Sequence, residues 1–199
     1  MAPIRAYYLP TDATSDIDES RPVNIEKLST LGWKISSVAG GHDEIEQAGL
    51  KWAQELGFPV TQEGCIVPFN FDVEKNVATM APEVITMFAL LMKAVEAENR
   101  KGKQIDLATA VSAVLAVTSG SPYVDVEDVT AVGWIRIHFN PGMIFCVPTG
   151  AKYRADFNEE NKRTKGIAFF KETISNHGML VKDEIDNHPT RQVYLNAHT

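Results

Sequence analysis

The segment from residue 120 to residue 157 constrains the fold of this 199-residue chain more than any other part of it. Glycine and proline mark tight turns there, at Asn140-Pro141-Gly142 and Pro148-Thr149-Gly150. Short strands separated by such turns, at intervals of roughly ten residues, are typical of a β-sandwich or a β-barrel. The β-prone runs in and after this segment cover residues 123–126, 134–139, 143–147 and 167–171.

The helical patterns lie mainly toward the N-terminus. The clearest covers residues 82–100, where Pro82 suits the first turn and apolar residues recur every three or four positions. Because helices and strands are segregated along the chain, we expect an α+β fold that is mainly β, with N-terminal and peripheral helices. No repeat or linker divides the sequence, so we expect one domain over residues 1–199. The other elements that we expect are helices at residues 25–31 and from Asp43, as N-cap, to Leu56, and strands at residues 4–8 and 33–38.

Residues 107–118 fit two kinds of structure. The run is rich in alanine, and Asp106 could cap it as a helix, but its valines and the turn at Gly120-Ser121-Pro122 suit a strand. Periodicity does not decide between a helix and a strand in so short a run.

Composition limits the partners of the chain. The formal net charge is −7, from 19 basic and 26 acidic side chains, so we expect neither a nucleic acid nor an anionic membrane as partner. The longest apolar stretch, residues 84–95, is too short to span a bilayer, and no secretory signal is recognised at the N-terminus. Two distant cysteines, Cys65 and Cys146, suit a reducing compartment. We therefore expect a cytoplasmic protein with a small-molecule substrate, for which a homo-oligomer is compatible with the sequence.

Four segments of the chain, in the right order, resemble the acireductone dioxygenases, a family of the cupin superfamily. Gly142, Pro148 and Gly150 form the pattern G-x5-P-x-G, which is similar to the second cupin motif. The resemblance implies a cupin-type β-barrel, or jelly-roll sandwich, from about Cys65 onward. Earlier helices and one or two strands would complete it, and the helix at residues 82–100 would pack outside. The resembling segments are PVNIEKLSTLGWKI from Pro22, residues 121–157, KGIAFF from Lys165 and DNHPTRQVYL from Asp186.

The same resemblance implies a metal site whose ligands this chain lacks. The family's four ligand positions, three histidines and a glutamate, fall here at Leu107, Thr109, Ala113 and Tyr153. The resemblance also puts Leu115 and Ala168 where the family has arginines that face the substrate, and Ala155 where it has an aromatic residue. Iron and nickel need nitrogen and carboxylate ligands, and a neutral phenol is a poor substitute. We therefore expect no metal and no other cofactor.

Tyr153 is the first candidate for a catalytic residue. The strand geometry that would aim a metal-binding histidine into the barrel should aim this side chain inward too. A tyrosine in a pocket serves as a general acid, as a base if its pKa is lowered, or as a hydrogen-bond donor to an enolate. Lys152 and Arg154 would favour the phenolate if they approached it. The alternative is that Tyr153 only fills the space left by the metal.

The run at residues 134–139 supplies a second set of candidates. Alternation puts Trp134, Arg136 and His138 on one face and three apolar side chains on the other. The polar face meets either solvent or the cavity, and His138 would titrate near neutrality as an acid or a base. The catalytic candidates are Tyr153 and His138, and the substrate-binding candidates are Arg136, Trp134, Leu115 and Ala155.

Three functions follow from these observations. The first is a metal-independent enzyme on an acireductone dioxygenase-like scaffold. It would isomerise, cyclise, eliminate from or decarboxylate an enolisable or polyketide-like molecule in a biosynthetic pathway. The second is a non-catalytic module that binds a small molecule or a protein. The third, an acireductone dioxygenase of methionine salvage, is disfavoured by the residues at the ligand positions.

Overall fold

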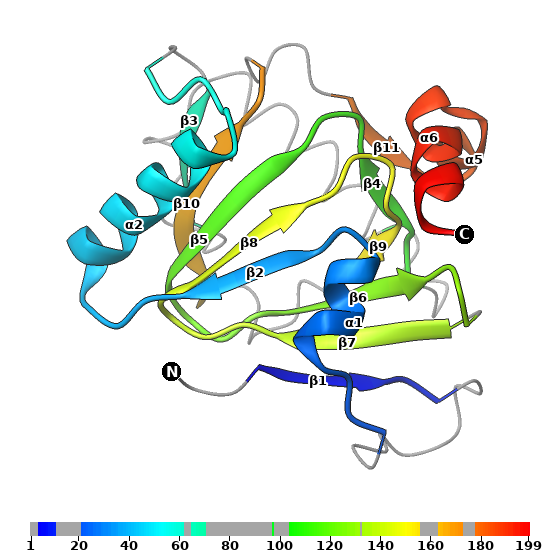
Figure 1. Ribbon diagram of the computed structural model, residues 1–199, viewed down its shortest axis with the longest axis horizontal. Helices are drawn as coiled ribbons and strands as arrows, with labels where there is room; N and C mark the ends of the chain where they lie inside the picture. Colours follow the sequence, from blue (N-terminus) through cyan, green and yellow to red (C-terminus); the bar gives the residue numbers. More distant parts are fainter. Residues whose placement is uncertain are drawn as a thin grey trace.

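Two antiparallel sheets face each other in the computed structural model, which describes residues 4–10, 21–61, 65–70, 97, 104–131, 133–155, 163–172 and 178–199 (Figure 1). The six-stranded sheet has the order β1 (Arg5–Tyr8), β7 (Gly133–His138), β6 (Tyr123–Asp128), β9 (Tyr153–Arg154), β4 (Leu107–Thr109) and β11 (Met179–Val181). The five-stranded sheet has the order β2 (Lys34–Ser37), β8 (Met143–Val147), β5 (Ala113–Ser119), β10 (Lys165–Phe170) and β3 (Ile66–Asn70). The N-terminal strands β1 and β2 each form an edge, so they complete the sandwich as expected.

The described helices lie around the sandwich. Helix α1 (Ile25–Thr30) lies next to β2, and α2 (His42–Glu55) packs on the outer face of the five-stranded sheet against β5 and β10. Helices α5 (Asp183–Asn187) and α6 (Pro189–His198) lie at the opposite end, beside β11 (Figure 1). The mainly-β sandwich of two antiparallel sheets with N-terminal and peripheral helices is therefore confirmed. Among the described residues, no helix is both long enough and apolar enough to cross a membrane.

The ambiguous run at residues 107–118 forms two strands, β4 and β5, and no helix. They belong to different sheets, so residues 110–112 pass from one sheet to the other. The alternative in which Asp106 caps a helix is wrong, because a strand follows it. The Asp106 carboxylate instead accepts a hydrogen bond from Arg154 Nε at 2.6 Å. Each half of the run is specified by its strand partners and not by local propensity.

The predicted start of α2 is also wrong by a short distance. Gly41 is the N-cap, and the backbone N–H of Gly41 donates a hydrogen bond to the side chain of Glu44 at 2.9 Å. Asp43 instead lies in the first turn, where a negative charge suits the positive end of the helix dipole. The helix expected at residues 82–100 lies outside the described residues, apart from residue 97.

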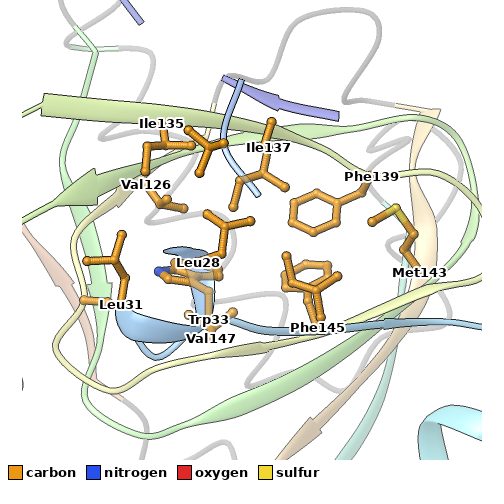
Figure 2. Close-up of a cluster of buried hydrophobic side chains, with 14 of the residues drawn as sticks. Leu28, Leu31, Trp33, Val126, Ile135, Ile137, Phe139, Met143, Phe145 and Val147 are labelled. Carbon is orange, nitrogen blue, oxygen red and sulfur yellow. The ribbon is translucent and has the colours of Figure 1, made fainter. Parts of the chain in front are cut away.

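The interior between the sheets is an apolar cluster with residues from both sheets (Figure 2). Ile135 and Ile137 of β7 face Phe145 and Val147 of β8, and Leu28 of α1 packs between them. Phe139 stacks on Phe145 with ring centroids 4.0 Å apart. A second cluster lies under α2 and includes Ile45, Ala53, Val114, Ala116 and the free thiol Cys146.

The two glycines of the G-x5-P-x-G pattern are required by the backbone. Gly142 has φ +91, and a Cβ there would lie 2.2 Å from Val38 O. Gly150 has φ +77, and its Cβ would lie 2.3 Å from Thr190 O. Both glycines therefore adopt a conformation that L side chains rarely take, in turns that another segment closely covers. The fold alone explains why they are present without the metal ligand that follows them in the family.

Candidate functional site

The strand register places Tyr153 inside the sandwich. Tyr153 pairs with Val126 of β6 on one side and with Leu107 of β4 on the other, and paired residues point to the same face. Val126 belongs to the interior cluster, and Tyr153 packs against that cluster. Ala108, which follows Leu107, packs on the other face with Leu180 and Ile185. The inward direction expected for Tyr153 is therefore what the structure shows.

The same register places Thr109 beside Tyr153. Thr109 lies two residues after Leu107 and so shares its inward face, and its register partner is Met179 of β11. The Tyr153 hydroxyl lies 3.6 Å from the Sδ atom of Met179. Tyr153, Thr109 and Met179 therefore meet at one end of the interior.

The opposite sheet contributes Leu115 to this end. Leu115 pairs with the core residue Phe145 on β8 and with Ala168 on β10, so it faces inward. Leu115, Tyr153, Thr109 and Met179 all remain partly exposed although they point between the sheets. These four residues are therefore less fully buried than the packed cluster beyond them.

Burial determines the protonation of Tyr153. Desolvation raises the pKa of its phenol well above the usual value, and no charged group opposes that effect. Lys152 forms an ion pair with Asp186, and Arg154 with Asp106, so both cations lie away from the hydroxyl. A role for Tyr153 as a base with a lowered pKa is thus disfavoured. The hydroxyl stays protonated and is available to donate a hydrogen bond.

Two further polar atoms at this end have no hydrogen-bond partner among the residues that the structure describes. They are Nε1 of Trp33 and Oγ1 of Thr109, and both are buried. The Trp33 ring meets the Tyr153 ring edge-on, with centroids 6.4 Å apart and planes at 85°. Buried polar groups normally have partners, so two unpartnered atoms beside a weakly bonded hydroxyl need an explanation.

The other sequence candidates lie on the outer face of the six-stranded sheet. Arg136 donates to both carboxylate oxygens of Asp125, at 2.6 and 2.7 Å. His138 Nε2 lies 3.0 Å from the hydroxyl of Tyr7. Trp134 stacks under the guanidinium of Arg154, whose Cζ lies 3.6 Å from the ring centroid. Alternation predicted that Trp134, Arg136 and His138 share one face of the strand. That face is the outer one, whereas Tyr153 lies on the inner face, so His138 and Tyr153 do not share a site.

Arg136 and Asp125 form a buried ion pair that the sequence does not suggest. Asp125 is 0% exposed although it points outward. Burial alone would lower the pKa of Arg136, but the hydrogen bonds and charge of Asp125 outweigh it and raise that pKa. The pair holds β6 to β7, which is a structural role.

The ligand positions of the family do not form a metal site here. Leu107, Thr109, Ala113 and Tyr153 occupy the inward faces of three strands, and none offers the nitrogen or carboxylate ligand that iron or nickel needs. The described part of the chain contains no group of three or more His, Cys, Asp or Glu side chains that could hold a metal. Ala155 packs near Leu107 in a small apolar cluster and adds no polar atom.

Sequence reasoning missed two residues of this end, Trp33 and Met179. Trp33 precedes β2, far from Tyr153 in the chain, and nothing in its local pattern points to the interior. Thr109 appeared only as a lost ligand position. Its hydroxyl becomes notable because the structure gives it no partner.

Comparisons with known proteins identify no family for this chain. No protein-family model and no curated protein matches this sequence. The chain is similar to a solved structure described as an acireductone dioxygenase from Bacillus anthracis with a cadmium ion in its active centre. The identity is 10%, 80% of this chain and 84% of that chain are covered, and the TM-score is 0.44. It is also similar to procruciferin, an 11S globulin from Brassica napus, with 23% identity, 38% and 19% coverage, and a TM-score of 0.29.

Proposed function

We propose that this chain is a metal-independent enzyme on an acireductone dioxygenase-like cupin scaffold. It would act in the cytoplasm, in a biosynthetic pathway, on an enolisable or polyketide-like small molecule. The observation that carries the proposal is the Tyr153 hydroxyl, which is protonated, points between the sheets and, among the described residues, has only the thioether of Met179 as partner. A thioether is a weak acceptor, so a substrate oxygen would readily replace it.

The chemistry that this geometry supports is stabilisation of an enol. When an α-proton leaves a ketone for water, negative charge develops on the carbonyl oxygen. A donor already positioned in an apolar site stabilises that charge strongly, because no solvent has to reorganise. Tyr153 would donate a hydrogen bond to this oxygen. If it transfers its proton there to give the enol, the phenolate that remains takes up the proton that water received from carbon. Isomerisation, cyclisation, elimination and decarboxylation of carbonyl compounds all pass through such an intermediate.

Metal chemistry is not part of the proposal, because the donor set does not fit it. An acireductone dioxygenase needs a metal that binds the enediolate, and Leu107 and Ala113 offer no donor atom. Leu115 and Ala168, which pair across β5 and β10, replace the cations that the resemblance implies.

One observation favours the second candidate, a module that binds a small molecule without turnover. Among the described residues that face this end of the interior, no side chain is suited to act as a base, since Tyr153 stays protonated. A binding module would need the apolar surroundings and the donors, and nothing more.

The first prediction tests the role of Tyr153. In D2O, the wild-type protein should accelerate exchange of the α-protons of 1-tetralone, an uncharged aryl ketone, as followed by proton NMR. Tyr153→Phe should lower that rate by roughly 10²-fold, the usual scale for a general acid, with an unchanged circular dichroism spectrum. A chelator should change neither rate.

Tyr194→Phe is the matched control. The Tyr194 hydroxyl donates to Leu31 O at 3.0 Å and belongs to the contact of α6, not to the site. This variant should lose about 1 kcal/mol of stability and keep the exchange rate. Equal exchange in the wild type and Tyr153→Phe, at equal ketone binding, would support the binding module. Exchange that a chelator abolishes would contradict metal independence.

A further inference from the structure

We infer that Thr109 and Trp33 form, with Tyr153, the ligand-binding polar group of the interior, and that the ligand is an uncharged apolar molecule with at least two oxygen acceptors. This rests on the proposed function only in placing the ligand at the Tyr153 end. It assigns roles to two residues that the catalytic proposal does not use.

The first support is the state of the three polar atoms. Trp33 is 1% exposed, and its Nε1 is a donor without a partner. The Thr109 hydroxyl also has no partner, and the Tyr153 hydroxyl has only a sulfur at 3.6 Å. A buried donor without an acceptor costs free energy in the ligand-free protein. Ligand oxygens at this end would satisfy these donors.

The second support is that these atoms share one end of the sandwich. Figure 2 shows the indole nitrogen of Trp33 on the side of Leu31 and Val126, away from Phe139. Val126 is the register partner of Tyr153. Thr109 reaches the same end through Met179, which pairs with Thr109 and contacts the Tyr153 hydroxyl.

The number of hydrogen-bond donors on the protein indicates how many acceptor oxygens the ligand has. Three hydroxyl or indole hydrogens converge here, whereas a carbonyl oxygen has two lone pairs. A ligand with two carbonyl oxygens, such as a 1,3-dicarbonyl compound, satisfies all three donors, and a monoketone does not.

The apolar surroundings of the Tyr153 hydroxyl indicate that the ligand is uncharged. The described charged neighbours in the chain, Lys152 and Arg154, are paired with Asp186 and Asp106 away from the Tyr153 hydroxyl, whose pKa is raised by desolvation. The facing positions Leu115 and Ala168 are apolar. Burying an anion without a partner is far costlier than burying a neutral carbonyl, so the site selects against carboxylates and phosphates.

The experiment measures binding of four probes by ligand-observed NMR titration: 2-acetyl-1-tetralone, 1-tetralone, tetralin and 1-naphthoate. The wild-type protein should bind the 1,3-diketone more tightly than the monoketone and the monoketone more tightly than tetralin, and should not bind the anion. Thr109→Val and Trp33→Phe should each weaken the diketone by roughly 3- to 10-fold, as for one lost hydrogen bond. Both should leave tetralin unchanged.

Two control variants match the two substitutions. Thr164 is 1% exposed, and its Oγ1 also has no partner among the described residues. It lies just before β10, at the opposite end of that strand from Phe170, which pairs with Ala113. Thr164→Val and Thr109→Val should both raise the melting temperature of the free protein, yet only Thr109→Val should weaken diketone binding. Trp52→Phe, on α2 outside the sandwich, should leave binding unchanged.

The outcomes separate this inference from the catalytic proposal. If the wild type binds the diketone and neither Thr109→Val nor Trp33→Phe weakens it, the inference is wrong while the role of Tyr153 stands. A lower melting temperature for Thr109→Val would also overturn it, since the hydroxyl would then have a partner. If the wild type binds no neutral probe, both proposals fail. Should Trp33→Phe not fold, Thr109→Val decides alone.

Discussion

Asp128 shows how a single buried carboxylate joins three elements. It is 0% exposed at the end of β6, and it accepts hydrogen bonds from Tyr8 of β1 at 2.7 Å and from Lys27 of α1 at 3.0 Å. The backbone and side chain of Thr130 add two more, at 2.9 and 2.8 Å. Burial alone would raise the pKa of Asp128, but these hydrogen bonds outweigh it and lower the pKa to about 2.

The stability of the fold should therefore depend on Asp128 in acid. A carboxyl whose pKa is about 2 in the folded protein, against an ordinary value of 3.8, stabilises the fold above pH 4. That contribution, about 2 kcal/mol, is lost as the pH falls from about 4 through about 2. Urea unfolding measured between pH 6 and pH 2 should show this loss in the wild type. Asp128→Asn should be less stable at pH 6 and should lack this part of the pH dependence.

Glu55→Gln, at the exposed end of α2, is the control for Asp128→Asn and should keep the wild-type pH profile. A profile in Asp128→Asn that is as steep as in the wild type would show that other carboxyl groups carry the acid sensitivity.

Helix α6 fixes the turn that leads into β9. Arg191 is buried, and it donates to Gly150 O at 3.3 Å and pairs with Glu127 of β6 at 2.5 Å. Gly150 lies against the backbone of Thr190, where a Cβ would lie 2.3 Å from the carbonyl oxygen. Since Tyr153 follows this turn by three residues, α6 holds the element that aims the candidate catalytic hydroxyl.

Gly150→Ala should therefore be far more damaging than an ordinary glycine substitution. It combines the strain of a left-handed residue, about 1–2 kcal/mol, with a backbone clash that only movement of α6 or the turn relieves. We expect a total loss of roughly 3 kcal/mol or more, at the high end for a single substitution, measured by urea unfolding. Diketone binding should weaken as well, because β9 shifts with the turn.

Gly57→Ala separates the two contributions. Gly57 has φ +76, nearly the value of Gly150, but nothing lies within 4 Å of the position of its Cβ. This variant should lose only the conformational cost, about 1 kcal/mol, and keep binding. Similar losses in both variants would mean that the contact with α6 is unimportant.

At the scale of the whole molecule, the sandwich is packed unevenly. One end of the interior is closed by Phe139, stacked on Phe145, and by Met143, all largely excluded from solvent. At the Tyr153 end, the inward side chains stay partly exposed. We expect the closed end to supply stability and the Tyr153 end to bind the ligand.

Truncation at the two ends should separate stability from binding. Phe139→Ala removes a ring that is 0% exposed and stacked on Phe145. It should lower the free energy of unfolding by about 3–5 kcal/mol, as for a large core truncation. Ligand binding should weaken only under conditions in which the variant unfolds. Leu115→Ala, at the Tyr153 end, should cost less in urea unfolding and should alter the affinity for 1-tetralone. The reverse order of stabilities would contradict this division of the interior.

The sequence by itself determined the elements and much of the architecture. Glycine and proline mark the turns around Asn140 and Thr149, and alternation in β7 sorts Ile135 and Ile137 to the interior and Arg136 to the outside. These patterns are local, because a strand alternates with period two and a turn needs particular residues at particular positions. The expectation of no metal at Leu107, Thr109, Ala113 and Tyr153 rests on the resemblance and stays a prediction.

Only the tertiary structure decided which residues meet. The run at residues 107–118 had to be divided between two sheets before Leu107 and Thr109 could be placed on an inward face. Trp33 approaches Tyr153 across the sandwich, and His138 lies on the opposite side of the sheet. The physical reason is that burial, pKa and an unsatisfied hydrogen bond depend on neighbours distant in the chain, which no local pattern of residues encodes.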